Sequence, residues 1–261
     1  MDLELTGKVA IVTGGNRGIG ASIAQELARE GADVFLVARD AALLDRMAEE
    51  ISHRFGRRAG TYAADLRKPD APPALVKAVL AEFGRIDILV NNAGSTKRGH
   101  FLSLTEEDWI DGYALKVHGY VRMARSAWPE LQRSSGTIVN IVGAGSRVGT
   151  SEFMIGGSVN SALLNFTKSL ADLGKIEGIR VNAINPGRTQ TERLVRNLDR
   201  MAAEAQIGRQ AAAVKLLAEA GIARFGRPEE IGWLTAFLAS PRAAFINGSI
   251  IEIDGGETRA L

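Results

Sequence analysis

The stretch that decides the fold is Lys8–Gly20, KVAIVTGGNRGIG. Lys8–Thr13 is short and apolar, which predicts a buried strand, and a helix is predicted over Ile19–Glu30. The glycine-rich turn between them lacks Cβ atoms, so it allows positive φ angles and close approach of a ligand to the backbone. The following helix presents free N–H groups and a partial positive charge, so this turn is predicted to bind a diphosphate.

Alternating strands and helices extend from this stretch along the whole chain. The strands are short, rich in valine and isoleucine, and typical of strands covered on both faces. The pattern predicts βαβ units in an α/β, Rossmann-type, doubly wound seven-stranded parallel sheet with helices on both faces. The expected strands are Lys8–Thr13, Asp33–Val37, Gly60–Ala64, Ile86–Val90, Thr137–Val142, Arg180–Asn185 and Ser249–Ile253. The expected helices are Ile19–Glu30, Ala41–Phe55, Pro72–Phe83, Glu106–Gln132, Ser158–Leu173 and Glu229–Ala239.

Composition excludes several classes of function. The chain has 261 residues, a net charge of +2 and no cysteine. One domain over residues 1–261 is expected, with no nucleic-acid surface and no thiolate metal site. The N-terminal sequence lacks the features of a signal peptide, and no apolar run is long enough to span a membrane. These observations predict a cytoplasmic protein without bound metal.

One region, residues 187–226, breaks the alternation because it is helix-prone and contains no strand. It follows the strand predicted to end at Asn185, so it should overhang the edge of the sheet where ligands bind in this architecture. We therefore expect it to act as a substrate lid, with a purely structural packing element as the alternative.

Further motifs occur in a fixed order after the glycine turn. Residues 13–20 read TGGNRGIG, Asn91–Gly94 reads NNAG, and Arg180–Thr191 reads RVNAINPGRTQT. Together with Arg224–Gly256, these segments resemble the short-chain dehydrogenase/reductase family, and most closely its ketoacyl-reductase-like members. The resemblance covers nearly the whole chain and implies an oxidoreductase that acts on a carbonyl/alcohol pair with a nicotinamide dinucleotide.

The resemblance also implies which residues bind the cofactor. NAD-preferring members carry an acidic residue at the end of the second strand, where this chain has Ala38 followed by Arg39. Two guanidinium groups, those of Arg17 and Arg39, would suit a 2′-phosphate, so NADP is predicted, with NAD as the alternative. The predicted cofactor-binding residues are Gly14, Asn16, Arg17, Gly18, Ile19, Gly20, Arg39, Asp65, Leu66, Asn92, Ala93, Gly94, Asn160, Pro186, Gly187, Thr189 and Thr191.

The resemblance implies four catalytic positions, which the family usually fills with Asn, Ser, Tyr and Lys. In the family, Tyr exchanges a proton with the substrate and Lys lowers its pKa, while Ser bonds the carbonyl and Asn positions a water. Aligned on SALLNFTKSLA at residues 161–171, none of the four positions holds the expected residue. In the order Asn, Ser, Tyr and Lys, the positions hold Lys116, Gly143, Gly156 and Asn160.

Lys116 and Asn160 have exchanged identities relative to that pattern. Our hypothesis is that Lys116 restores a cation beside the nicotinamide ribose, and that a partly buried lysine also acts as an acid or base. The alternative is that Lys116 reaches solvent and Asn160 alone bonds the ribose. Ser151, Glu152 and Ser158 are further possible proton donors, and Phe153 or Met154 could fill the space left by the missing tyrosine.

Three functions remain open from the sequence. The first is an NADP(H)-dependent oxidoreductase with atypical acid–base residues, and the second is a catalytically lapsed dinucleotide-binding sensor or subunit. The third is a non-redox lyase, isomerase or hydrolase on the same scaffold, because a fold alone does not define a function. The expected partners are a small-molecule substrate and further copies of the chain in a dimer or tetramer, with no nucleic acid and no membrane.

Overall fold

The computed structural model describes residues 1–259 and contains a seven-stranded sheet in the order β3-β2-β1-β4-β5-β6-β7. All neighbouring strands pair in parallel, as predicted. The strand order reverses between β1 and β4, which in open α/β sheets creates the crevice where ligands bind. The strands are β1 (Val9–Thr13), β2 (Asp33–Ala38), β3 (Ala59–Ala63), β4 (Ile88–Asn91), β5 (Thr137–Ile141), β6 (Arg180–Pro186) and β7 (Ile250–Ile253).

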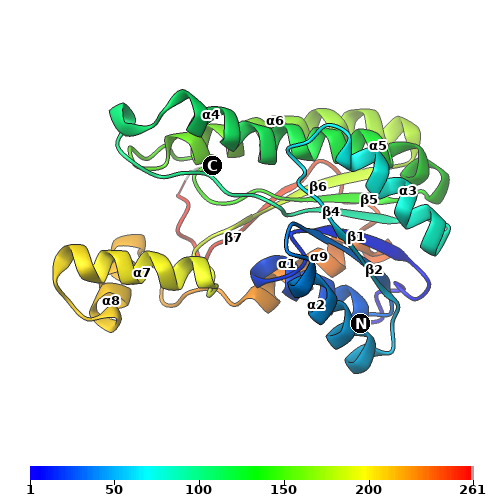
Figure 1. Ribbon diagram of the computed structural model, residues 1–261, viewed down its shortest axis with the longest axis horizontal. Helices are drawn as coiled ribbons and strands as arrows, with labels where there is room; N and C mark the ends of the chain where they lie inside the picture. Colours follow the sequence, from blue (N-terminus) through cyan, green and yellow to red (C-terminus); the bar gives the residue numbers. More distant parts are fainter. Residues whose placement is uncertain (260–261) are drawn as a thin grey trace.

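Helices cover both faces of this sheet (Figure 1). One layer contains α1 (Gly18–Arg29), α2 (Ala41–Phe55) and α9 (Pro228–Ala239). The other contains α3 (Ala71–Phe83), α4 (Glu106–Gly112), α5 (Gly119–Ser134) and α6 (Met154–Glu177). Short helical turns lie at η1 (Phe101–Ser103), η2 (Tyr113–His118) and η3 (Pro241–Ala243).

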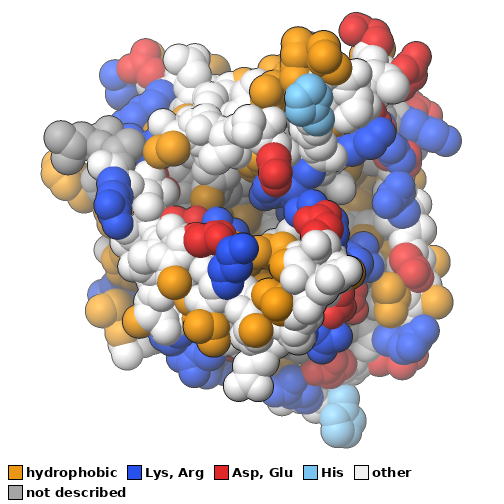
Figure 2. Space-filling model, turned by 90° about the vertical axis from the view of Figure 1, so that its left-hand side faces the viewer, with side chains coloured by type: hydrophobic (Ala, Val, Ile, Leu, Met, Phe, Trp, Pro, Cys, Tyr) orange, Lys and Arg blue, Asp and Glu red, His pale blue; other side chains and the backbone are white. Residues whose placement is uncertain are grey.

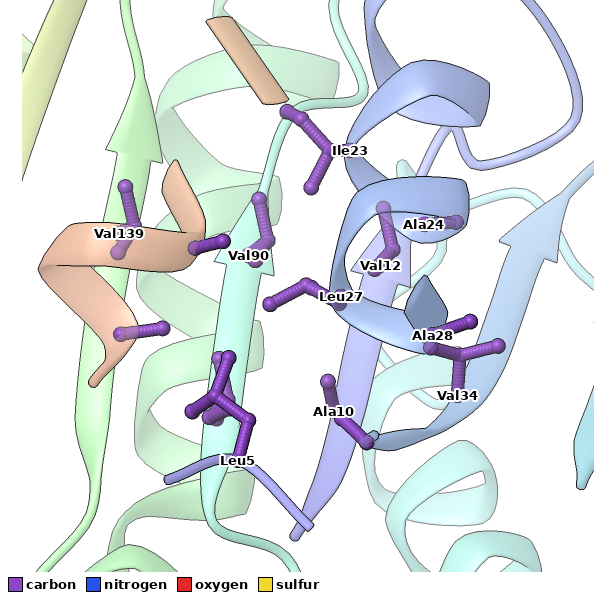
Figure 3. Packing of buried hydrophobic residues seen from close by; sticks show 14 of the residues in the cluster. Leu5, Ala10, Val12, Ile23, Ala24, Leu27, Ala28, Val34, Val90 and Val139 are labelled. Carbon is purple, nitrogen blue, oxygen red and sulfur yellow. The ribbon is translucent and has the colours of Figure 1, made fainter. Parts of the chain in front are cut away.

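The sheet separates two hydrophobic cores because alternate residues of each strand point to opposite faces. In β1, Ala10 and Val12 face α1, where they pack with Leu27 (Figure 3). Val9 and Ile11 face the other layer. Burial on both faces explains the continuous apolar runs in the sequence.

Two predicted helices differ from the observed ones. The helix expected over Glu106–Gln132 is interrupted by the π-helical turn η2, which includes Lys116. The helix expected from Ser158 begins earlier, at Met154, because the ring of Phe153 packs against the bare backbone of Gly156. Glycine disfavours helix in general, and here the missing Cβ leaves the space that the ring needs.

Residues 187–226 form two helices beside the carboxyl ends of the strands (Figure 1). These are α7 (Glu192–Ala205) and α8 (Arg209–Ala220), joined by their own small apolar cluster around Leu198 and Leu216. The position agrees with the overhang expected from the sequence. Among residues 1–259, no helix combines the length and apolar character that crossing a membrane requires.

Candidate active site

The glycine turn after β1 forms a backbone cradle at the start of α1. Gly14 and Gly18 have φ angles of 68° and 57°, in the left-handed region that favours glycine. A Cβ on Gly20 would overlap the carbonyl oxygen of Gly14, so this turn closes only with bare backbone. The first turn of α1 has no acidic residue and no side-chain cap, so its N–H groups remain available to an anion. These features fit a dinucleotide diphosphate.

The loop after β4 is joined to this cradle through Thr13. The Thr13 hydroxyl accepts hydrogen bonds from the backbone N–H groups of Asn92, at 2.8 Å, and Ala93, at 3.0 Å. The Asn92 amide donates in return to the Thr13 carbonyl at 2.9 Å. The ends of β1 and β4 are therefore fixed relative to each other on both sides of the crevice.

The residues predicted for the adenosine end lie at the carboxyl ends of β2 and β3. Arg39 is exposed just beyond β2. Hydrogen bonds from Arg67 lower the pKa of Asp65, and the charge of Arg39 contributes less, so these groups lie near one another. Leu66 is buried beside them. Arg17 reaches Glu192 of α7 at 3.4 Å in an exposed contact.

The loop after β6 faces the glycine turn from the other side. The backbone N–H of Gly187 donates to the carbonyl of Ile253 at 3.1 Å, and this bond holds the end of β6, at Pro186, against β7. The methyl group of Thr191 lies 3.6 Å from the Cβ position of Gly18. Thr189 is buried and bridges to Gly226. The predicted cofactor residues of the two loops thus face each other across one crevice.

Lys116 and Asn160 meet in the interior, as the exchange of identities predicted. The Lys116 ammonium donates to the Asn160 side-chain oxygen at 2.6 Å and to the Val142 carbonyl. The Asn160 amide donates to the carbonyls of Gly143, at 3.3 Å, and Ala144, at 3.1 Å. All the polar atoms of Asn160 are therefore engaged, and the alternative in which Lys116 reaches solvent is wrong because its side chain is buried.

Burial and the charge of Arg193, in that order, lower the pKa of Lys116 to about 7. The two accepting carbonyl oxygens favour the protonated form, so both protonation states are accessible near neutral pH. Tyr120 lies nearby, but its hydroxyl donates to the Ile141 carbonyl at 2.8 Å and burial raises its pKa. The Tyr120 hydroxyl is therefore not available as a proton donor in the crevice.

Phe153 fills the space beside Gly156, the position at which the sequence resemblance implied a tyrosine in the family. A Cβ on Gly156 would overlap the Phe153 ring. The Arg98 guanidinium lies over the same ring, 4.0 Å from its centroid. Of the other proposed donors, the Ser158 hydroxyl is occupied by a hydrogen bond to Ile155 at 3.0 Å. An aromatic ring and a cation therefore lie beside Gly156.

The crevice opens on the face formed by the carboxyl ends of the strands. Figure 2 shows a hollow on this side, with both Lys or Arg and Asp or Glu side chains around its rim. A cavity of about 320 Å³ lies beside Phe153, between the loop at 145–150 and the start of α6. Residues 1–259 contain no group of His, Asp and Glu side chains suited to a metal ion.

Sequence reasoning missed three residues that shape this site. Thr13 is the first residue of the TGGNRGIG motif, and its place in that motif was the only feature of the sequence that indicated a role in the site. Arg193 donates to the Gly94 carbonyl at 2.7 Å, and Arg98 stacks on Phe153. Both arginines depend on how α7 and the loop after β4 fold over the crevice, which the local sequence does not encode.

Comparison with known proteins places these features in a family. Residues 14–258 match the family model described as enoyl-(acyl carrier protein) reductase. An uncharacterized oxidoreductase of Mycobacterium tuberculosis is 36% identical over 98% of this chain and 94% of its own length. L-Sorbose reductase from Gluconobacter frateurii, solved with NADPH and L-sorbose, superposes with a TM-score of 0.96 at 33% identity and covers 100% of both chains. A short-chain dehydrogenase from Burkholderia cenocepacia, solved with NADP, gives a TM-score of 0.85 at 32% identity over 97% of this chain and 98% of its own.

Proposed function

Because the chain belongs to the short-chain dehydrogenase/reductase family and is an oxidoreductase of that type, we propose that it interconverts a carbonyl compound and an alcohol through Lys116. The observation that carries this proposal is the buried contact of 2.6 Å between Lys116 and Asn160. A lapsed binding protein would have no need of a buried amine whose pKa is lowered to about 7, the value that suits acid–base catalysis.

The cofactor is NADP(H), in agreement with solved relatives that contain NADPH or NADP. The cradle of Gly14, Gly18 and Gly20 would hold its diphosphate, and Arg17 and Arg39 would bind its 2′-phosphate. The loops at 92–94 and 186–191 would surround its nicotinamide end. When bound, NADP(H) supplies or accepts the hydride, and the protein supplies orientation and proton transfer.

Lys116 handles the proton in this proposal. Its Nζ donates to the Val142 carbonyl and to Asn160, which leaves a third N–H for the crevice. In reduction, that proton goes to the substrate oxygen as the alcohol forms; in oxidation, neutral Lys116 takes the proton back. Asn160 is a positioning residue, because its amide bonds to Gly143 and Ala144 fix the oxygen that Lys116 contacts.

The substituted family positions give Lys116 this role. Gly143 and Gly156 carry no hydroxyl, and the ring of Phe153 occupies the place of the tyrosine. Removing those hydroxyls removes the usual donors to a developing alkoxide. A lysine at position 116 would supply a cation and a proton within the same crevice. The site would therefore use atypical acid–base residues on an ordinary cofactor scaffold.

Two further features complete the proposed enzyme. Residues 1–261 would act as one domain in which α7 and α8 form the substrate lid, tied to the loop after β4 by the bond from Arg193 to Gly94. The expected cytoplasmic location stays a prediction.

A homo-oligomer would form through α5 and α6, which share an apolar groove. The residues lining this groove are Val121, Ala124, Arg125, Trp128, Pro129, Phe166, Leu170 and Leu173.

An exchange experiment tests the role of Lys116. Lys116→Asn and Asn160→Lys are made singly and together, and NADPH oxidation is followed with a panel of keto sugars, keto acids and aldehydes. The expected loss for Lys116→Asn is about 10²–10⁴-fold in kcat, and the double variant should recover part of it because the cation returns to the same pair. Lys77→Asn, at an exposed position of α3, is the matched control.

Binding measurements separate this proposal from the alternative functions. NADPH binding is followed by fluorescence titration in the same four proteins. Tight NADPH binding with no turnover of any carbonyl or alcohol would indicate a sensor, and unchanged turnover in Lys116→Asn would remove Lys116 from the mechanism.

A further inference from the structure

Four arginines from three separate segments gather at the entrance of the crevice. Arg98 lies in the loop after β4, Arg188 follows β6, and Arg193 and Arg200 belong to α7. The charges of the other three all lower the pKa of Arg98, after the larger effect of burial, so each of them lies within electrostatic range of Arg98. Such a concentration of one sign contrasts with the net charge of +2 for the whole chain.

The amphipathic character of α7 directs its arginines toward the crevice. Arg193 and Arg200 are seven residues apart, so they lie about 20° apart around the helix axis. Leu194 and Leu198 lie on another face of the helix and pack against α8. The apolar face is thus covered by α8, and the arginine face remains for the crevice.

Two of these arginines are paired with carboxylates, whereas the other two are not. Arg188 contacts Glu257 at 2.9 Å, and Arg200 contacts Glu204 at 3.1 Å. Within residues 1–259, Arg98 and Arg193 form no ion pair, although Glu152 lies near enough to raise the pKa of Arg98. Arg98 instead stacks on Phe153, and Arg193 donates to a neutral carbonyl.

Arg193 also lies next to the reacting centre. It donates to the carbonyl of Gly94, and the Cβ position of the same glycine is 3.0 Å from Cδ of Lys116. Gly94 therefore contacts Arg193 through its carbonyl and lies against the side chain of Lys116. One small molecule would then place an anionic group at Arg193 and its carbonyl at Lys116.

We propose that the substrate carries an anionic group, a carboxylate or a phosphate, which Arg98 and Arg193 bind beside Lys116. This inference rests on the proposed oxidoreductase function and specifies its substrate class as an oxo or hydroxy compound that bears an acid group. Arginine suits this role because its planar fork bonds both oxygens of such a group. Attraction between the bound anion and the arginines on α7 would then favour closure of the proposed lid over the crevice that holds the substrate.

The test uses unreactive probes, so that it does not depend on turnover. Succinate and glycerol 3-phosphate are titrated calorimetrically into the NADPH-saturated protein, with dimethyl succinate and glycerol as their neutral counterparts. We expect at least one anion to bind about tenfold or more tightly than its neutral counterpart, and to weaken as salt is added. The stronger of the two anions identifies the acid group as carboxylate or phosphate.

Variants connect this preference to the named arginines. Arg98→Gln and Arg193→Gln should reduce the preference for the anion by about tenfold, whereas Arg98→Lys should retain part of it. Arg46→Gln, at an exposed position of α2, should change nothing. Equal binding of charged and neutral probes, or an unchanged preference in Arg98→Gln, would overturn the inference. Failure to bind NADPH would instead overturn the proposed function, because the titrations begin from the NADPH complex.

Discussion

The two walls of the crevice differ in which atoms of the chain form them, backbone or side chain. The cofactor wall consists mainly of backbone: bare glycines after β1, free N–H groups at the start of α1, and the Thr13 bonds to the loop after β4. The proposed catalytic wall depends on side chains: Lys116 and Asn160 form a buried contact, and the Phe153 ring packs on Gly156. Backbone geometry tolerates few substitutes, whereas a proton can be delivered by several side chains from several directions.

Local contacts explain why the two walls differ in their tolerance of substitution. A Cβ at Gly20 would meet both the Gly14 carbonyl and the Asn92 amide, so one change there affects two motifs. By comparison, the contact between Lys116 and Asn160 is formed by side chains alone. The glycine turn therefore tolerates fewer substitutions than the wall that holds Lys116.

The largest expected effect lies on the backbone wall. Gly20→Val should weaken NADPH binding more than 100-fold, because the clash with Gly14 and Asn92 prevents closure of the turn. A 100-fold loss of affinity corresponds to about 2.7 kcal/mol of binding free energy. Fluorescence titration of NADPH measures the loss, and thermal unfolding shows whether the chain still folds. Gly208→Val is the control, since a Cβ there meets nothing within 4 Å. Wild-type affinity in Gly20→Val would show that the cradle is not the diphosphate site.

A smaller effect is expected where the cofactor wall does use side chains. Arg39→Gln should weaken NADPH binding about tenfold to 100-fold and leave NADH binding unchanged, because only NADPH has the 2′-phosphate. The ratio of the two dissociation constants is the measurement, with Arg46→Gln as the control. Equal weakening of both dinucleotides would mean that Arg39 serves the fold rather than cofactor choice.

A third effect concerns the energetics of the proposed catalytic wall. The pKa of Lys116 is lowered from 10.5 to about 7 in the folded protein, so between these values the unfolded chain binds more protons. The free energy of unfolding of wild type relative to Lys116→Met should therefore rise with pH in this window, by at most about 1.4 kcal/mol per pH unit. Below pH 7 both states hold the proton and the difference levels off.

Urea denaturation from pH 6 to 10 measures this dependence. Lys77→Met, an exposed lysine replaced in the same way, should show no such slope relative to wild type. A flat difference between wild type and Lys116→Met would show that Lys116 keeps an ordinary pKa, and the proposed proton transfer near neutral pH would lose its basis.

Local patterns predicted most of the sheet and the cofactor wall. Neighbouring residues in the sequence are enough to predict strands buried on both faces and a glycine turn before α1. The closeness of Lys116 and Asn160 was predicted from the alignment with the family. The π-helical turn η2 and the early start of α6 were not predicted. Both depend on tertiary packing, including the Phe153 ring against Gly156, which overrides the low helix propensity of glycine.

The position of the arginines at the entrance also depends on tertiary packing and was not predicted from the sequence. Arg193 and Arg98 are distant in sequence, and only the return of α7 across the crevice brings their charges together. A sequence pattern could locate the helix-prone segment that contains α7 and α8, but not the direction in which each of its side chains points.

The packing of Phe153 on Gly156 also governs how this active site could evolve. A tyrosine introduced at position 156 by a single substitution would collide with the ring, since even its Cβ would overlap it. Removing the ring first would leave a void and take away the aromatic surface on which Arg98 stacks. A tyrosine at position 156 therefore requires two coordinated changes with an impaired intermediate, so each of these two residues restricts replacement of the other.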